Sequence, residues 1–97
     1  MEVRKAAYPQ HALRSALKSI QMPRYLTYRI LLTKEPEGGF TVTVPALPGC
    51  ITYGENMEEA ITMGKDAIEL YLESLVAHDE PIPTEENTFE YSVSVVA

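Results

Sequence analysis

Residues 44–60, which read VPALPGCITYGENMEEA, divide the chain into a β-rich first part and one long predicted helix. The dipeptide Pro48-Gly49 favours a tight turn, because proline presets φ at the first turn position and glycine accepts φ above zero. Residues 50–53 leave room for a short strand, which Gly54 ends. The stretch therefore predicts a turn, a short strand and a helix start in close succession.

The predicted helix starts with the spacing of a capping box. Asn56 can accept a hydrogen bond from a first-turn amide, and Glu59, three residues later, can reach back toward the residues before the helix. An apolar stripe at helical spacing predicts that the helix covers residues 57–77 and stops before Pro81. Gly64 lies on this stripe, so we expect a close approach between helix and sheet there.

Alternation of apolar and polar side chains predicts the strands. Residues 24–34 and 40–44 alternate on either side of a Gly-containing loop, and residues 89–95 alternate after the helix. The predicted fold is therefore α+β: an antiparallel sheet in the order β-β-β-α-β with one long helix on one face. The other face is expected to be polar and rich in threonine; its predicted members are Thr27, Arg29, Thr41, Thr43, Ser92 and Ser94.

The first 23 residues differ from the rest and form a basic extension. Leu13, Leu17 and Ile20 recur at helical spacing and favour a short amphipathic helix at about residues 10–20, with a frayed basic tail as the alternative. Residues 1–24 carry five basic side chains and one acid, a net charge of +4. The remaining 73 residues carry three basic side chains and thirteen acids, a net charge of −10. The predicted globular domain covers residues 24–97.

Bulk composition describes one ordinary globular domain. The chain has 97 residues, of which 45% are hydrophobic and 23% charged. It has no apolar run near the ~20 residues that span a bilayer, and its first residues lack the apolar core of a signal peptide. A single cysteine cannot form an internal disulfide. We therefore expect a cytoplasmic protein that does not enter a membrane.

The sequence offers no catalytic constellation. His11, Cys50 and His78 are far apart, which makes them a poor metal set and a poor nucleophile–base pair. Gly38-Gly39 is a hairpin turn without the Lys-Ser/Thr that follows in a phosphate-binding loop. We therefore predict no catalytic residue, no metal site and no cofactor.

The pattern Pro-x-Leu-Pro-Gly-Cys-x-Thr-x-Gly-Glu-x-x-Glu-Glu-Ala over residues 45–60 resembles the signature of HicB-type antitoxins. The resemblance extends over about residues 24–96. The positions that carry it are assigned as structural signature residues: Pro45, Leu47, Pro48, Gly49, Cys50, Gly54, Asn56 and Glu59.

Domains of this type resemble a truncated ribonuclease H fold, but a nuclease needs several carboxylates converging on metal ions. The centres of the predicted strands carry Thr, Arg, Val and Ser instead. The resemblance thus implies a non-enzymatic antitoxin that holds and neutralises a small, basic HicA-type RNA-cleaving toxin. The alternative is a stand-alone homo-oligomeric binding module without a toxin. Because the chain ends at Ala97 straight after the last predicted strand, we expect no direct DNA binding.

A toxin that binds RNA should present a basic face, so acidic residues are the predicted partner contacts. They are Glu35 and Glu37 in the hairpin loop, which have no evident structural role, and Glu55 and Glu58 at the helix start. One uncovered sheet face and an open strand edge also predict a homodimer or a larger homo-oligomer.

Overall fold

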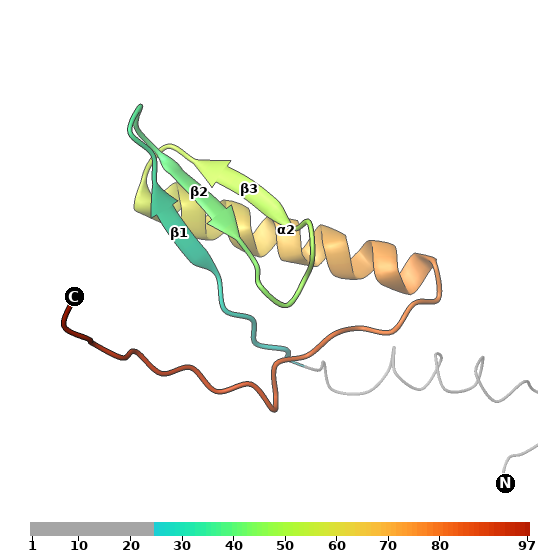
Figure 1. Ribbon diagram of the computed structural model, residues 1–97. Helices are drawn as coiled ribbons and strands as arrows, with labels where there is room; N and C mark the ends of the chain where they lie inside the picture. Colours follow the sequence, from blue (N-terminus) through green and yellow to red (C-terminus); the bar gives the residue numbers. More distant parts are fainter. Residues whose placement is uncertain (1–24) are drawn as a thin grey trace, which may run out of the picture.

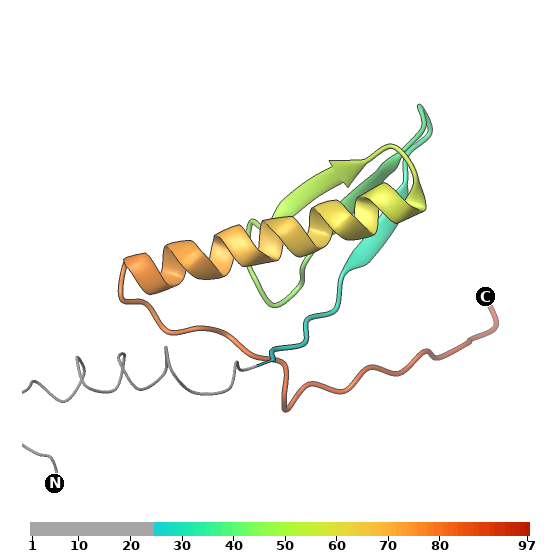
Figure 2. The same cartoon turned by 180° about the vertical axis from the view of Figure 1, so that it is seen from behind.

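The computed structural model describes residues 25–97. The predicted basic extension and its helix at about residues 10–20 lie outside the described residues. Within them the order is β1 (Leu31–Lys34), β2 (Phe40–Thr43), β3 (Ile51–Gly54) and α2 (Met57–Ala77). The three strands form one antiparallel sheet, and α2 lies across one of its faces (Figures 1 and 2). The predicted α+β class, with a single long helix on one sheet face, is confirmed.

Helix α2 has the predicted bounds, but a different feature ends it. The amide of Glu80 donates to the carbonyl of Leu75 at 2.8 Å, and the amide of Asp79 donates to that of Val76 at 3.1 Å. Asp79 takes a left-handed φ of 58°, which completes a Schellman motif. The helix therefore ends at Ala77 by this motif, and Pro81 lies beyond its end.

Strand β1 is shorter than predicted because its partner strand is short. Leu31 pairs with Thr43, the last residue of β2, and Lys34 pairs with Phe40. Beyond β2 the chain turns, with the amide of Leu47 bonded to the carbonyl of Val44 at 3.0 Å. Residues 25–30 are therefore not part of the sheet ladder.

The fourth predicted strand, residues 89–95, is not formed within the chain. Residues 89–97 belong to no ladder, and the ribbon carries them away from the sheet and the helix (Figures 1 and 2). Their side chains are exposed throughout. The β-β-β-α part of the predicted order is present, and the predicted closing strand pairs with nothing among residues 25–97.

The core lies between β2, the loop after it and the inner face of α2. Val42, Leu47 and Ala60 are fully buried, and Val44 and Cys50 nearly so. Gly64 brings the helix close to the sheet, as predicted: a Cβ at this position would lie 3.2 Å from Cγ1 of Val42. Side chains of partly buried residues complete the cluster: Tyr28, Ile30, Ala67, Ile68, Tyr71 and Leu72.

Candidate protein-binding surface

The loop between β2 and β3 holds the first half of the signature against the core. Leu47 and Cys50 are buried, and Gly49 has a left-handed φ of 81°. The hydroxyl of Tyr71 donates to the carbonyl of Pro48 at 2.8 Å and ties the loop to α2. Burial raises the pKa of the Cys50 thiol, which disfavours the reactive thiolate. Pro45 is exposed. This loop is a structural element.

The second half of the signature starts the helix. The side chain of Asn56 accepts from the amide of Glu59 at 2.8 Å, and the carboxylate of Glu59 accepts from the amide of Glu55 at 2.6 Å. Gly54 is required by space, since a Cβ there would lie 2.3 Å from the backbone nitrogen of Ala60. Its φ is not left-handed, in contrast to Gly49.

Four acidic side chains act electrostatically on Tyr53, at one end of the molecule. Tyr53 donates to the carbonyl of Gly38 at 3.0 Å and so links β3 to the hairpin loop. Partial burial raises the pKa of Tyr53, and negative charges nearby raise it further. We call these carboxylates, from two separate segments, the acidic end: Glu35 and Glu37 in the hairpin loop, Glu55 and Glu59 at the start of α2.

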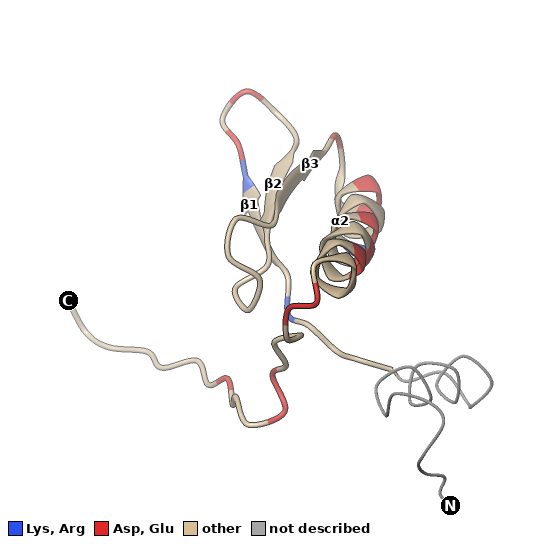
Figure 3. Ribbon diagram, turned by 90° about the vertical axis from the view of Figure 1, so that its right-hand side faces the viewer, with Lys and Arg blue, Asp and Glu red and all other residues tan. Residues whose placement is uncertain are grey.

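The predicted partner contacts differ in where the structure places them. Glu37 and Glu55 are exposed members of the acidic end. Glu58 is exposed in the first turn of α2 but does not act on Tyr53. Further acidic residues follow the outward side of α2, so the negative charge extends from the hairpin loop along the helix (Figure 3).

Glu35 has a structural role that the sequence analysis did not assign. Its carboxylate accepts a hydrogen bond from the hydroxyl of Thr41 at 2.5 Å. Its backbone closes the hairpin loop, with its amide bonded to the carbonyl of Gly39 and its carbonyl to the amide of Gly38, both at 3.0 Å. The prediction that Glu35 is free of structural duty is wrong, and Glu37 is the cleaner probe.

The outer face of the sheet is less polar than predicted. Leu31, Thr43 and Ile51 are aligned across the three strands, and Thr33, Thr41 and Tyr53 form the next row. Leu31, Ile51 and Tyr53 are exposed on this face. The sequence contained a sign of this, because every second residue of a strand lies on the same face. Residues 31, 51 and 53 alternate in this way and place apolar side chains on the outer face. This face therefore mixes apolar and threonine side chains, and Ser92 and Ser94 are not part of it.

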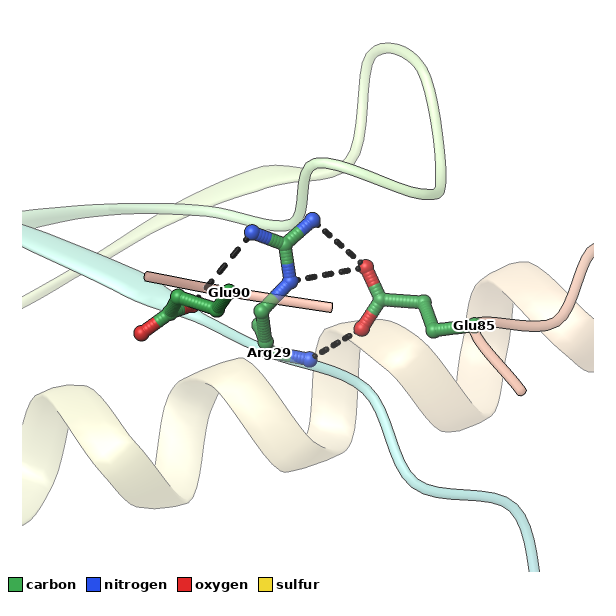
Figure 4. A network of polar contacts seen from close by, with 3 residues as sticks. All are labelled: Arg29, Glu85 and Glu90. Carbon is green, nitrogen blue, oxygen red and sulfur yellow. Dashed lines mark hydrogen bonds and ion pairs between the residues drawn. The ribbon is translucent and has the colours of Figure 1, made fainter. Parts of the chain in front are cut away.

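An ion pair joins the segment before β1 to the connection after α2, and sequence reasoning missed it. Two guanidinium nitrogens of Arg29 donate to one carboxylate oxygen of Glu85 at 2.9 and 3.1 Å, and the amide of Arg29 donates to the other at 2.8 Å (Figure 4). A longer contact of 3.4 Å reaches Glu90. These hydrogen bonds from Arg29 lower the pKa of the Glu85 carboxyl. Local sequence patterns do not predict this contact, because 56 positions separate Arg29 from Glu85.

Between residues 25 and 97 the structure holds no group of three or more His, Cys, Asp or Glu that could bind a metal ion. His78 caps α2, where its Nδ1 lies 2.8 Å from the carbonyl of Ser74. No helix in the same residues is long and apolar enough to cross a membrane.

Comparison with known proteins identifies the family. A family model described as "HicB_like antitoxin of bacterial toxin-antitoxin system" matches residues 28–95. The chain belongs to the HicB-like antitoxin family. The match includes both halves of the signature, the acidic end and most of the exposed C-terminal segment of this HicB-like chain.

Individual relatives agree with this assignment. A UPF0150 protein of Thermoplasma acidophilum is 47% identical over 58 residues, 60% of this chain and 84% of the relative. A UPF0150 protein of Synechocystis is 48% identical over 59 residues, 61% of this chain and 75% of the relative. The protein of Escherichia coli K12 named antitoxin HicB is 31% identical over 72 residues, 72% of this HicB-like chain and about half (52%) of the relative.

Proposed function

We propose that this protein is a non-enzymatic antitoxin that binds and neutralises a small, basic HicA-type RNA-cleaving toxin in the cytoplasm. Membership of the HicB-like antitoxin family supports this proposal. So does the likeness to antitoxin HicB of Escherichia coli. The residues between 25 and 97 offer no cluster of metal-ligating side chains on which a nuclease reaction could run.

The observation that carries the proposal is the acidic end. The hydrogen bond from the Tyr53 hydroxyl to the Gly38 carbonyl links β3 to the hairpin loop, so carboxylates from two segments 18 or more positions apart share one end of the molecule. Such a concentration of negative charge attracts a basic protein at long range and repels the phosphate backbone of a nucleic acid. The exposed ring of Tyr53 offers an aromatic contact with a polar tip, a combination enriched at protein interfaces.

The proposal is tested by a search for a small basic reading frame beside this gene, co-expression of its product with this chain, and purification through a tag on one partner. We expect the two proteins to purify together, and we expect expression of this chain to restore growth of cells that produce the toxin. A neighbouring small basic protein that fails to bind, in a cell where both are produced, contradicts the proposal.

Charge reversal tests the role of the acidic end. We expect the Glu37→Lys, Glu55→Lys double variant to associate with the toxin about tenfold more slowly at low salt, because reversed charges remove the steering. A matched control, Asp66→Lys with Glu73→Lys, makes the same change in charge at exposed positions farther along α2. Surface plasmon resonance at several salt concentrations gives the rates. Equal slowing by both variants would assign the effect to net charge alone.

A further inference from the structure

An apolar groove lies between α2 and the segment that leads into β1. Its volume is about 620 Å³. The segment before β1 contributes Leu26 and Ile30, and α2 contributes Ile61, Ile68 and Leu72. Ile61 is half exposed here, and Ile68 is only partly buried. The sheet therefore leaves part of the apolar stripe of α2 uncovered.

The segment that lines the groove continues directly into β1, a strand that has a neighbour on only one side. In the sheet order β1-β2-β3, β1 pairs with β2 and its other edge is open among residues 25–97. An open edge presents unpaired backbone amides and carbonyls that accept a further strand. A strand laid there would direct every second side chain into the groove and the others away from it.

The C-terminal segment has the pattern that such a strand requires. Phe89, Tyr91, Val93 and Val95 are 73–90% exposed. They alternate with polar residues between positions 90 and 94, which would face solvent. In both Figure 1 and Figure 2 this segment leaves the body of the molecule and contacts neither sheet nor helix along its last part. Four exposed apolar side chains on one face of an extended segment indicate a strand that lacks its partner.

The connection before this segment directs it away from its own groove. The Arg29–Glu85 pair and the hydrogen bond from the Tyr28 hydroxyl to the Pro83 carbonyl fix residues 83–85 beside the start of the sheet. The amide of Thr88 then donates to the carbonyl of Glu85 at 3.0 Å, which turns the chain. Figure 4 shows Glu85 and Arg29 holding this connection. A segment that its connection holds away from its own sheet is available for exchange with the same segment of a second copy.

We propose that residues 89–96 of one copy add as a strand to the open β1 edge of a second copy, and that the second copy returns the same segment. The apolar side chains at positions 89, 91, 93 and 95 enter the groove of the partner. The exchange completes the predicted four-stranded sheet in each half of a homodimer. The groove and the tail are thus two parts of one interface.

Substitutions on the two faces of the segment provide the test. In the full chain, Tyr91→Lys with Val93→Lys places charge on the face that enters the groove, and Ser92→Lys with Ser94→Lys places the same charge on the opposite face. Light scattering after size exclusion should give a dimer for the unaltered protein. The first pair should weaken the dimer at least tenfold and the second should leave it intact. A monomeric unaltered protein, or equal behaviour of the two pairs, overturns the proposal.

A second measurement distinguishes exchange from folding of the segment onto its own chain. Copies labelled with ¹³C are mixed with unlabelled copies, and isotope-filtered nuclear Overhauser spectra are recorded. We expect contacts between the ring of Phe89 in one copy and the methyl groups of Ile61 or Ile68 in the other. Contacts seen only within one copy show a closed monomeric sheet and overturn the proposal. So does a segment that becomes ordered only when a different protein is added.

Discussion

At the scale of single residues, two glycines of the signature are needed for different physical reasons. Gly49 takes a left-handed φ, and a Cβ there would have open space around it. Gly54 has no such φ, but a Cβ there would meet the backbone nitrogen of Ala60 at 2.3 Å and its Cα at 2.4 Å. The first position limits backbone conformation and the second limits volume.

This difference predicts unequal costs for the same substitution. Gly49→Ala should lower the free energy of unfolding by about 1 kcal/mol, the usual cost of a left-handed non-glycine residue. Gly54→Ala should cost about 3 kcal/mol or more, because neither the helix backbone nor β3 can move without loss of packing. Urea unfolding followed by circular dichroism measures both values. Equal costs would show that the start of α2 shifts easily.

At the scale of elements, α2 has three environments around its axis. Ala60 and Gly64 are buried against the sheet. Ile68 packs against the core but also lines the groove. Leu70 is 66% exposed on the outer side. The helix is therefore anchored by small residues at its start and by larger ones farther along.

A charge placed on two of these sides should change stability by very different amounts. Ile68→Asp should lower the free energy of unfolding by about 3 kcal/mol, because a carboxylate is moved into the apolar cluster. Leu70→Asp, the matched control, should change it by less than about 0.5 kcal/mol. Melting temperatures at several protein concentrations separate this effect from any loss of self-association. An unchanged melting temperature for Ile68→Asp would mean that the inner face of α2 is wrongly assigned.

The elements also show what the sequence could and could not predict. The bounds of α2, its Asn56–Glu59 cap and the approach at Gly64 depend on local spacing, and all three are confirmed. The length of β1 depends on where β2 ends, which no pattern within residues 24–34 contains. The strand predicted over residues 89–95 is not formed in the structure, because alternation of apolar and polar side chains does not specify a pairing partner.

The acidic character of the candidate site could be predicted from the sequence, but the positions of its residues relative to one another could not. Acidic residues in two loops were visible in the sequence, and their convergence on Tyr53 depends on how the hairpin loop meets the start of α2. The hydrogen bond from the Thr41 hydroxyl to the Glu35 carboxylate depends on the register of the hairpin strands. The role of Glu37 as a partner contact stays a prediction.

At the scale of the whole molecule, the Arg29–Glu85 pair holds the connection after α2 against the start of the sheet (Figure 4). The carboxylate of Glu85 is largely buried and accepts from both the side chain and the amide of Arg29. These hydrogen bonds favour the charged carboxylate and lower its pKa below the ordinary value of 4.5. Stability from this pair is therefore present above pH 4.5 and is lost as the pH falls through the lower folded-state value.

Replacing Glu85 should make this pH dependence visible. Glu85→Gln should be less stable than the unaltered protein at pH 7, and the difference should narrow as the pH falls below 4.5. Glu80→Gln removes a charge from an exposed nearby position and serves as the control. Urea midpoints between pH 7 and pH 3 provide the comparison. A difference that stays constant with pH would show that the ionised pair contributes nothing.

The same pair has a consequence for the order of folding. The sheet and α2 are joined by connections of a few residues, so their contacts are close in sequence and form rapidly. Closing the loop between positions 29 and 85 costs far more chain entropy, which favours forming this contact after the rest. Glu85→Gln should then speed unfolding while leaving the refolding rate nearly unchanged in stopped-flow measurements. The connection after α2, which directs the C-terminal segment, therefore takes its final position last. By then the groove that receives such a segment from another copy has already formed.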